Sequence, residues 1–131
     1  MFDNNVFIEN TCRNFEENGA VKGYQMETYI TYYRSIPLSM VNNICVHEDG
    51  KEVDRALIRC SVDGGEYWFT LDEMTTVVEH KWEYGEPMIV RVCRDGGLEK
   101  GEHEIDLNVI VRTAYIPVPL DGHKTRKVTI A

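Results

Sequence analysis

The sequence lacks the features that mark several large classes of protein. Its four cysteines include no Cys-x-x-Cys pair, which argues against zinc knuckles and thioredoxin-type redox pairs. No apolar run approaches the roughly 18 residues that a membrane-spanning helix needs. The first ten residues, MFDNNVFIEN, lack the basic and apolar stretches of a secretory signal. We therefore expect a cytoplasmic protein with reduced thiols.

Basic residues are also scarce. The 131 residues include 14 Lys plus Arg against 22 Asp plus Glu, which gives a net charge of −8. Binding to nucleic acid requires clustered Lys and Arg to neutralise phosphates, so this balance argues against that function. The length is typical of one domain, and we expect a single domain over residues 1–131.

Signals for helices are nearly absent. Thr70-Leu-Asp-Glu73 matches a capping box at a helix start, but little helical periodicity follows it, so we expect one short helical turn at most. Apolar and polar residues instead alternate with a period of two, which is typical of half-buried strands. The alternation is clearest over 105–115 and recurs over 24–33, 53–62 and 87–94.

Asn, Asp and Gly residues separate these alternating runs. Asp49-Gly50 and Asp63-Gly64-Gly65 are hairpin candidates, and Asp121-Gly122 is interpreted as a further turn. Several strands with frequent turns and little helix predict an all-β fold. We expect a single antiparallel β-sandwich, jelly-roll or immunoglobulin-like, with its strand order left open.

The residues form no recognisable catalytic or metal-binding pattern. The four histidines (His47, His80, His103 and His123) are far apart, and neither H-x-H nor H-E-x-x-H occurs. No G-x-S-x-G occurs either, and the glycine pairs have acidic neighbours and begin no helix, unlike phosphate loops. We therefore predict no catalytic residue, no metal ligand and no cofactor in this chain.

The aromatic residues are more informative. Two groups of them adjoin proline-stiffened segments, residues 32–38 and 115–120. Proline-containing segments lose little entropy on binding, and Tyr, Trp and Arg often anchor protein interfaces. These segments therefore predict a partner surface. The candidate interface residues are Tyr32, Tyr33, Arg34, Ile36, Pro37, Leu38, Tyr115, Pro117 and Pro119, with Trp82 and Tyr84 as a secondary pair.

Other interpretations of these aromatics stay open. Tyr32 and Tyr115 fit equally well as the ends of buried strand faces, with the prolines stopping the strands. Core packing is an equal alternative for Trp82 and Tyr84, and stacked aromatics also suit a sugar-binding face. The alternative functions are accordingly a free-standing cytoplasmic carbohydrate-binding module, or an assembly subunit of another sugar-degrading complex.

Seven short motifs occur along the chain in an order that carries information about its family. They are YYRSIPLSM (32–40), VHEDGKEV (46–53), SVDG (61–64), FTLDEM (69–74), KWEYG (81–85), GGLEKGEH (96–103) and YIPVP (115–119). In this order and spacing they resemble the small (β) subunit of bacterial C-glycoside deglycosidases. The resemblance covers nearly the whole chain and agrees with its length and its all-β pattern.

The resemblance implies a non-catalytic subunit of a carbon–carbon lyase. Such enzymes act on plant C-glycosides, flavonoid C-glycosides among them, whose sugar carries a 3-oxo group. The ketone acidifies the proton on C2, and removal of that proton lets the bond from C1 to the aglycone break in an elimination-type step. The large (α) subunit is expected to be a TIM-type barrel that holds a divalent metal, manganese, and the acid/base residues. The small subunit is expected to dock on it, with residues 32–38 and 115–120 in contact.

Overall fold

The strands and helix follow each other in a simple order along the chain. The strands are β1 (Arg13–Glu17), β2 (Ala20–Thr28), β3 (Ile36–Pro37), β4 (Val41–Glu48), β5 (Lys51–Glu52), β6 (Ile58–Ser61), β7 (Phe69–Thr70), β8 (Lys81–Trp82), β9 (Met88–Cys93), β10 (Gly101–Thr113) and β11 (Ile116–Ile130). The helical elements are α1 (Leu71–Met74) and two 3-10 turns, Leu38–Met40 and Arg55–Leu57. This computed structural model describes residues 5–31, 35–77, 79–113 and 116–130, and their side chains except those of 113 and 116–119.

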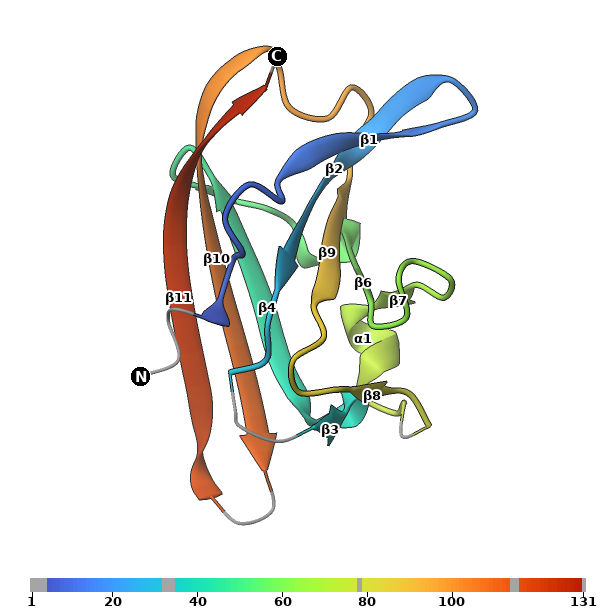
Figure 1. Cartoon of the computed structure of the whole chain (residues 1–131), viewed down its shortest axis with the longest axis vertical. Coiled ribbons are helices and arrows are strands. Elements are labelled where there is room, and N and C mark those ends of the chain that lie inside the picture. The colour runs from blue at the N-terminus through green and yellow to red at the C-terminus, as the bar shows by residue number, and fades with distance from the viewer. Residues whose placement is uncertain (1–4, 32–34, 78, 114–115, 131) are drawn as a thin grey trace.

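Two antiparallel sheets make up most of the molecule (Figure 1). One has five strands in the order β1-β2-β9-β6-β7, and the other has four in the order β11-β10-β4-β5. A third, two-stranded sheet pairs β3 with β8 at one end. The architecture confirms the all-β prediction with minimal helix.

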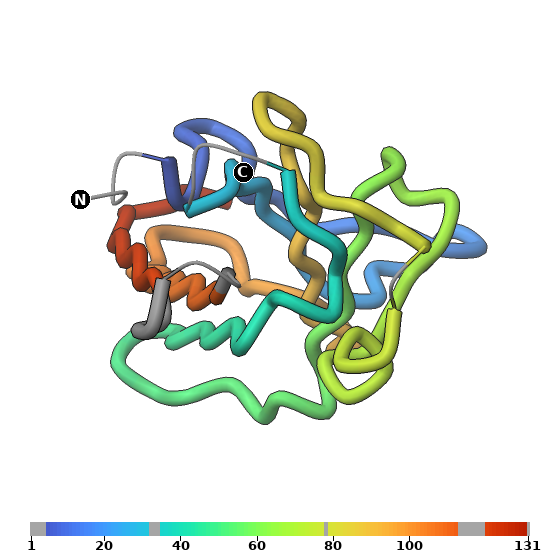
Figure 2. Tube along the Cα trace, turned by 90° about the horizontal axis from the view of Figure 1, so that it is seen from below, coloured from blue at the N-terminus to red at the C-terminus, as the bar shows by residue number. Residues whose placement is uncertain are grey.

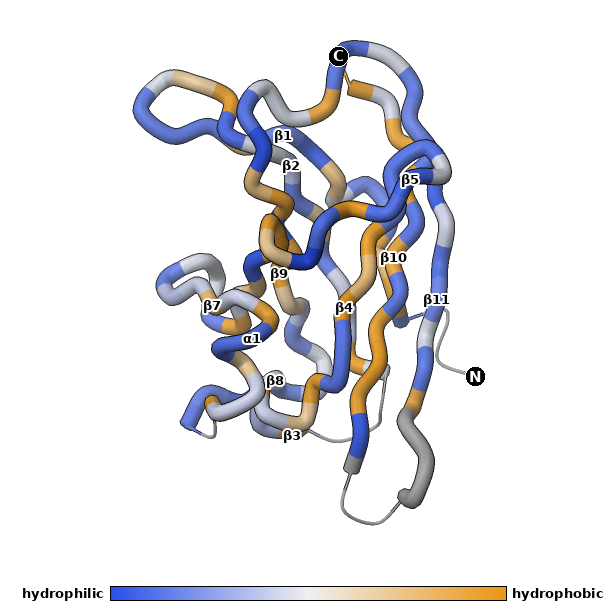
Figure 3. The backbone as a smooth tube through the Cα atoms, turned by 180° about the vertical axis from the view of Figure 1, so that it is seen from behind, coloured by the Kyte–Doolittle hydropathy of each residue, from blue (hydrophilic) through white to orange (hydrophobic). Residues whose placement is uncertain are grey.

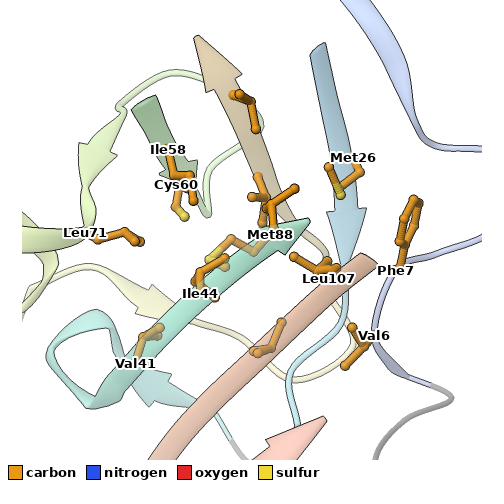
Figure 4. Close-up of a cluster of buried hydrophobic side chains, with 14 of the residues drawn as sticks. Val6, Phe7, Met26, Val41, Ile44, Ile58, Cys60, Leu71, Met88 and Leu107 are labelled. Carbon is orange, nitrogen blue, oxygen red and sulfur yellow. The ribbon is translucent and has the colours of Figure 1, made fainter. Parts of the chain in front are cut away.

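The hydrophobic core lies between the two large sheets. Figure 4 shows Met26 and Met88 of the five-stranded sheet facing Ile44 and Leu107 of the four-stranded sheet, and all four are at most 1% exposed. Hydrophobic positions alternate with polar ones along β10 (Figure 3), because successive side chains of a strand point to opposite faces. Along β10, this alternation is the pattern from which the strand was predicted.

The short helix forms where the capping box predicts it. The Thr70 hydroxyl accepts a hydrogen bond from the Glu73 backbone N–H at 3.1 Å, and the Glu73 carboxylate accepts one from the Thr70 N–H at 2.8 Å. These two bonds satisfy backbone donors that the first helical turn leaves free. The helix α1 ends after four residues, as the missing periodicity predicts. None of the helices in the described residues is long and apolar enough to cross a bilayer.

Both predicted hairpins are present. Asp49 and Gly50 take φ values of +50° and +84° and join β4 to β5, with Glu48 opposite Lys51. The Asp63 carboxylate accepts hydrogen bonds from the Ser61 hydroxyl and the Tyr67 N–H, which organises the loop between β6 and β7. Local turn chemistry thus sets these two connections.

The turn predicted at Asp121-Gly122 is wrong. Both residues lie inside β11, where Asp121 faces Ile110 and Gly122 faces Val109 of β10. β11 runs for fifteen residues in register with β10, apart from one irregularity near Thr113. A long ladder of backbone hydrogen bonds therefore overrides the local turn preference of Asp-Gly.

Candidate docking surface

One end of the sandwich gathers the regions that the sequence marks as a partner surface. β3, β8 and the adjoining ends of β10 and β11 all lie at the lower end in Figure 1, and Figure 2 views that end from below. The Thr31 hydroxyl, just before the first predicted segment, donates a hydrogen bond to the Leu120 carbonyl of the second at 3.4 Å. We call this region the docking end; it comprises Asn5, Tyr29–Thr31, Ser35–Leu38, Lys81–Glu86 and Leu120.

Part of the predicted interface lies outside the described residues. This holds for Tyr32, Tyr33, Arg34 and Tyr115, and for the side chains of Pro117 and Pro119. Their role at an interface stays a prediction.

Three of the predicted residues form the buried base of the docking end. Ile36 pairs with Trp82 across β3 and β8. Ile36 is 4% exposed, and Leu38 and Trp82 are fully buried. The Trp82 indole N–H donates to the Glu86 carbonyl at 3.2 Å, so its one polar group is satisfied. These side chains pack in the core of this chain, and the neighbouring Pro37 is half-buried.

Tyr84 differs from Trp82 because its side chain is 59% exposed. It lies in the turn after β8, where Gly85 takes a φ of +87° and the Glu86 N–H donates to the Glu83 carbonyl at 3.1 Å. The Ser35 hydroxyl accepts a hydrogen bond from the Tyr84 N–H at 2.9 Å and donates to the Glu83 carboxylate at 2.7 Å. The turn thus holds an exposed phenol in a fixed backbone position.

Tyr84 borders a shallow groove on the docking end. The groove is lined by Asn5, Tyr29, Ile30, Tyr84 and Gly85, and Tyr29 is 38% exposed. Its far wall is fixed by the Asn5 amide, which donates to the Ile30 carbonyl at 2.9 Å, and by the Tyr29 N–H, which donates to the Asn5 carbonyl at 2.8 Å. Two partly exposed tyrosines beside a groove suit the burial of an apolar group from a partner.

Sequence reasoning did not single out two residues that build this surface, Asn5 and Ser35. Asn5 lies 24 positions before Tyr29, and Ser35 lies 49 positions before Tyr84. Each acts through hydrogen bonds to backbone that is distant in sequence, which no local pattern reveals. The only local sequence feature that could have indicated a role for Ser35 is its position next to Ile36-Pro37.

Charged side chains gather at the opposite end of the sandwich, near the β4–β5 hairpin. Arg94 contacts the Glu48 carboxylate at 2.6 Å, and the His103 Nδ1 lies 3.0 Å from the Asp49 carboxylate. The other ring nitrogen of His103 lies 2.7 Å from the Glu99 carbonyl. The hydrogen bond to Asp49, and secondly that to Glu99, raise the pKa of His103, because both stabilise the imidazolium. With both nitrogens engaged, His103 is a structural ion-pair partner rather than an available base.

Neither the half-buried Cys12 nor the buried Cys60 is suited to nucleophilic chemistry. Burial raises the pKa of Cys12 and that of Cys60 to about 12 each. The reactive thiolate is therefore almost absent near neutral pH. Within the described ranges, no three His, Cys, Asp or Glu side chains come together as a metal site would require.

Comparisons with known proteins agree on one family. Residues 2–115 match the family described as C-glycoside deglycosidase beta subunit. The C-glycoside deglycosidase beta subunit of Eubacterium cellulosolvens is 28% identical over 100 residues, which cover 76% of this chain and 67% of that protein. The 3'-dehydrocarminate deglycosidase beta subunit of a Microbacterium species is 25% identical over 130 residues, which cover 90% of this chain and 83% of that protein.

Proposed function

This chain belongs to the family of C-glycoside deglycosidase beta subunits, and on that premise we propose that it is the non-catalytic small subunit of an enzyme that cleaves the C–C bond of 3-oxo C-glycosides. The observation that carries the subunit role is the docking end. It presents Tyr84 on a hydrogen-bonded turn beside a groove that Tyr29 also lines. A partner subunit that buries this surface gains apolar contact without having to order a flexible segment.

The proposed reaction needs a base and an acid. A base must remove the proton on C2 that the 3-keto group acidifies, and an acid must protonate the aglycone carbon as its bond to C1 breaks. In the described residues, His103 is held in an ion pair and the thiols of Cys12 and Cys60 stay protonated. We propose that the acid and the base belong to the large subunit.

The proposed partner is a TIM-type barrel related to sugar isomerases, located with this chain in the cytoplasm. A divalent metal, manganese, bound there would polarise the sugar oxygens as a Lewis acid. The part of this chain is to bind the barrel and stabilise it in the hetero-oligomer. The described residues offer no cluster of metal ligands of their own, so we assign the metal to the partner.

Co-expression tests this proposal directly. This chain, carrying the only affinity tag, is expressed with a barrel-type isomerase homologue encoded near it, and the eluate is assayed on a 3-oxo C-glycoside with and without manganese. We expect the larger protein to co-elute and the free aglycone to appear only when both chains are present. The large subunit expressed alone is the control.

Two other results would redirect the assignment. A complex that forms but releases no aglycone from any 3-oxo C-glycoside would indicate an assembly subunit of a different sugar-degrading enzyme. A chain that elutes alone, folded and inactive, would contradict the subunit role. The tyrosines of the docking end would then be tested for sugar binding by fluorescence.

A further inference from the structure

The four-stranded sheet ends in a long strand with an open edge. β11 is the outermost strand and pairs with β10 alone among the described strands. A strand paired on one side leaves alternate backbone N–H and C=O groups without a ladder partner on the other. On its open side, a groove separates residues 125–129 of β11 from the segment that includes Phe7 and Cys12.

The segment across that groove is itself fixed to the other sheet. The Ile8 N–H donates to the Glu27 carbonyl at 2.8 Å, which ties this segment to β2. Only Arg126 bridges the groove by a hydrogen bond in the described structure, from its Nε to the Phe7 carbonyl at 2.5 Å. The backbone edge of β11 beyond Arg126 is therefore accessible to another chain.

The charge of this edge is opposite to that of the rest of the molecule. β11 contains three basic residues (Lys124, Arg126 and Lys127) and one acidic residue (Asp121), a net charge of +2. Since the whole chain carries −8, the other residues together carry −10. Lys127 is exposed on the outer face, and Lys124 and Arg126 are half-buried on the face that carries the core. Basic side chains thus line both faces of β11, with Glu9 across the groove and Glu104 of β10 opposite Lys127 as nearby acidic residues.

We propose that the β11 edge binds an extended acidic segment of the large subunit, which adds to the four-stranded sheet as a further antiparallel or parallel strand. The proposal rests on the subunit role proposed above. Backbone hydrogen bonds would give this contact its affinity, and the lysines would favour acidic side chains on the added strand.

The charge argues against other occupants. Two copies of β11 paired edge to edge would bring their lysines and arginines close together, which costs free energy. A nucleic acid or an anionic membrane would meet the repulsion of the −10 on the remaining residues. Lysines on edge strands also discourage unwanted strand pairing, and the experiment must separate that protective role from a binding role.

Hydrogen exchange on the unmodified protein is the first arm of the test. Amide exchange across β11 is measured for this chain alone and for its complex with the large subunit. Strand addition predicts that amides of residues 125–129 exchange at least about tenfold more slowly in the complex, because new backbone hydrogen bonds form there.

Charge reversal is the second arm. Lys124→Glu with Lys127→Glu is compared with Lys51→Glu plus Lys100→Glu, two exposed lysines outside β11. Both double variants change the net charge equally. We expect the first to raise the Kd of the subunit complex about tenfold at low salt and the second less than about twofold, since attraction becomes repulsion only at the edge. Circular dichroism confirms that both variants are folded.

The outcomes are distinct. A complex that forms with no added protection in β11 and equal Kd values for both double variants overturns this inference and leaves the subunit role intact. If amide protection in β11 rises with the concentration of this chain in the absence of the large subunit, the edge binds a second copy. That result also overturns this inference. Failure of the unmodified chains to associate overturns the subunit role, and this inference with it.

Discussion

Trp82 and Tyr84 are two positions apart and have opposite roles in the structure. Trp82 is fully buried and closes the core beneath β3, whereas Tyr84 is 59% exposed in the turn that follows. In the sequence KWEYG both aromatic residues adjoin Glu83, so composition alone cannot separate them. The distinction comes from β8 ending at Trp82, after which the chain turns at Gly85.

Tyr84, the exposed residue of the two, should affect the affinity for the large subunit and not the stability of this chain. We predict that Tyr84→Ala raises the Kd for the large subunit by about tenfold, since a central interface tyrosine contributes about 1–2 kcal/mol. Its thermal unfolding midpoint should stay unchanged. The matched control is Tyr67→Ala, which removes a tyrosine of nearly equal exposure, 57%, from the β6–β7 loop. Equal Kd values for the two variants would contradict a docking role for Tyr84.

The buried residues of the docking end should matter for stability first. Ile36→Ala removes a side chain that is 4% exposed and lies opposite Trp82. We predict a loss of about 2–5 kcal/mol in the free energy of unfolding of the isolated chain, measured with urea, because a cavity remains. Ile36→Val, which deletes one methylene, should cost about 1 kcal/mol. A loss in Ile36→Ala no larger than in Ile36→Val would show that this end is loosely packed.

The ion pair of His103 and Asp49 should make stability depend on pH. Its hydrogen bond to Asp49 raises the pKa of His103, while the Glu104 N–H and then His103 lower the pKa of Asp49. The His103 contribution is complete below the unfolded pKa of about 6.5 and is lost as pH rises through the higher folded value. The Asp49 contribution is complete above about 3.9 and is lost as pH falls through the lower folded value.

The pair therefore stabilises the fold most between about pH 4 and 6.5. We predict that His103→Ala lowers the unfolding midpoint in this window and has a smaller effect at pH 9, measured by thermal scans at each pH. Asp49→Asn removes the main partner of His103 and should flatten the same part of the profile. A constant difference between wild type and His103→Ala at all pH values would contradict the ion pair.

Within the β1–β2 hairpin, two glycines lie in different environments. A Cβ on Gly23 would lie 2.0 Å from the Val92 carbonyl oxygen and 2.6 Å from the Phe15 ring, whereas a Cβ on Gly19 would meet nothing within 4 Å. Gly23 thus permits β1, β2 and β9 to approach closely near the irregular pairing after Phe15.

We predict that Gly23→Ala costs about 3 kcal/mol or more of unfolding free energy, because backbone must move to admit the methyl group. Gly19→Ala is the control in the same hairpin. Its φ of +80° is unfavourable for alanine, so it should cost about 1–2 kcal/mol. Urea unfolding of both variants measures the difference, and equal losses would mean that space at Gly23 is not limiting.

Most strands could be predicted from sequence because their signals are local. Alternation indicated β9 and β10, and Asp49-Gly50 indicated the β4–β5 hairpin. β11 was missed because its Asp121-Gly122 pair favours a turn, and only the partner strand β10 keeps it extended. β1 was missed as well, since its five residues are mostly exposed and do not alternate. Pairing between distant segments decides such cases.

The sequence marked candidate segments for the site but not how they come together. The sequence marked two proline segments at strand ends but did not place them together, and the hydrogen bond from Thr31 to Leu120 shows that they adjoin. Sequence reasoning had no means to find Asn5, which shapes the groove through a bond to Ile30. It also had no means to divide Trp82 from Tyr84 by burial. These assignments depend on contacts between residues that are far apart in the chain.

At the scale of the whole molecule, three surfaces are arranged around one core. The docking end carries exposed tyrosines, the opposite end carries the ion pairs of Arg94 and His103, and the open edge of β11 carries a positive charge. One continuous core lies between the sheets that carry these surfaces, and close-packed interiors deform little. A subunit built in this way suits a structural role, since it can fix the position of a partner without moving itself.

A structural role makes a specific kinetic prediction. If this chain only holds the large subunit in its active form, Tyr84→Ala should reduce aglycone release by reducing the population of the complex. Titrating the variant against a constant amount of large subunit should then restore the wild-type maximal rate, at about tenfold higher subunit concentration. The measurement is initial rate of aglycone release at saturating 3-oxo C-glycoside. A plateau that stays below the wild-type rate would mean that Tyr84 acts on the substrate as well, because mass action corrects a loss of affinity but cannot replace a missing contact in the transition state.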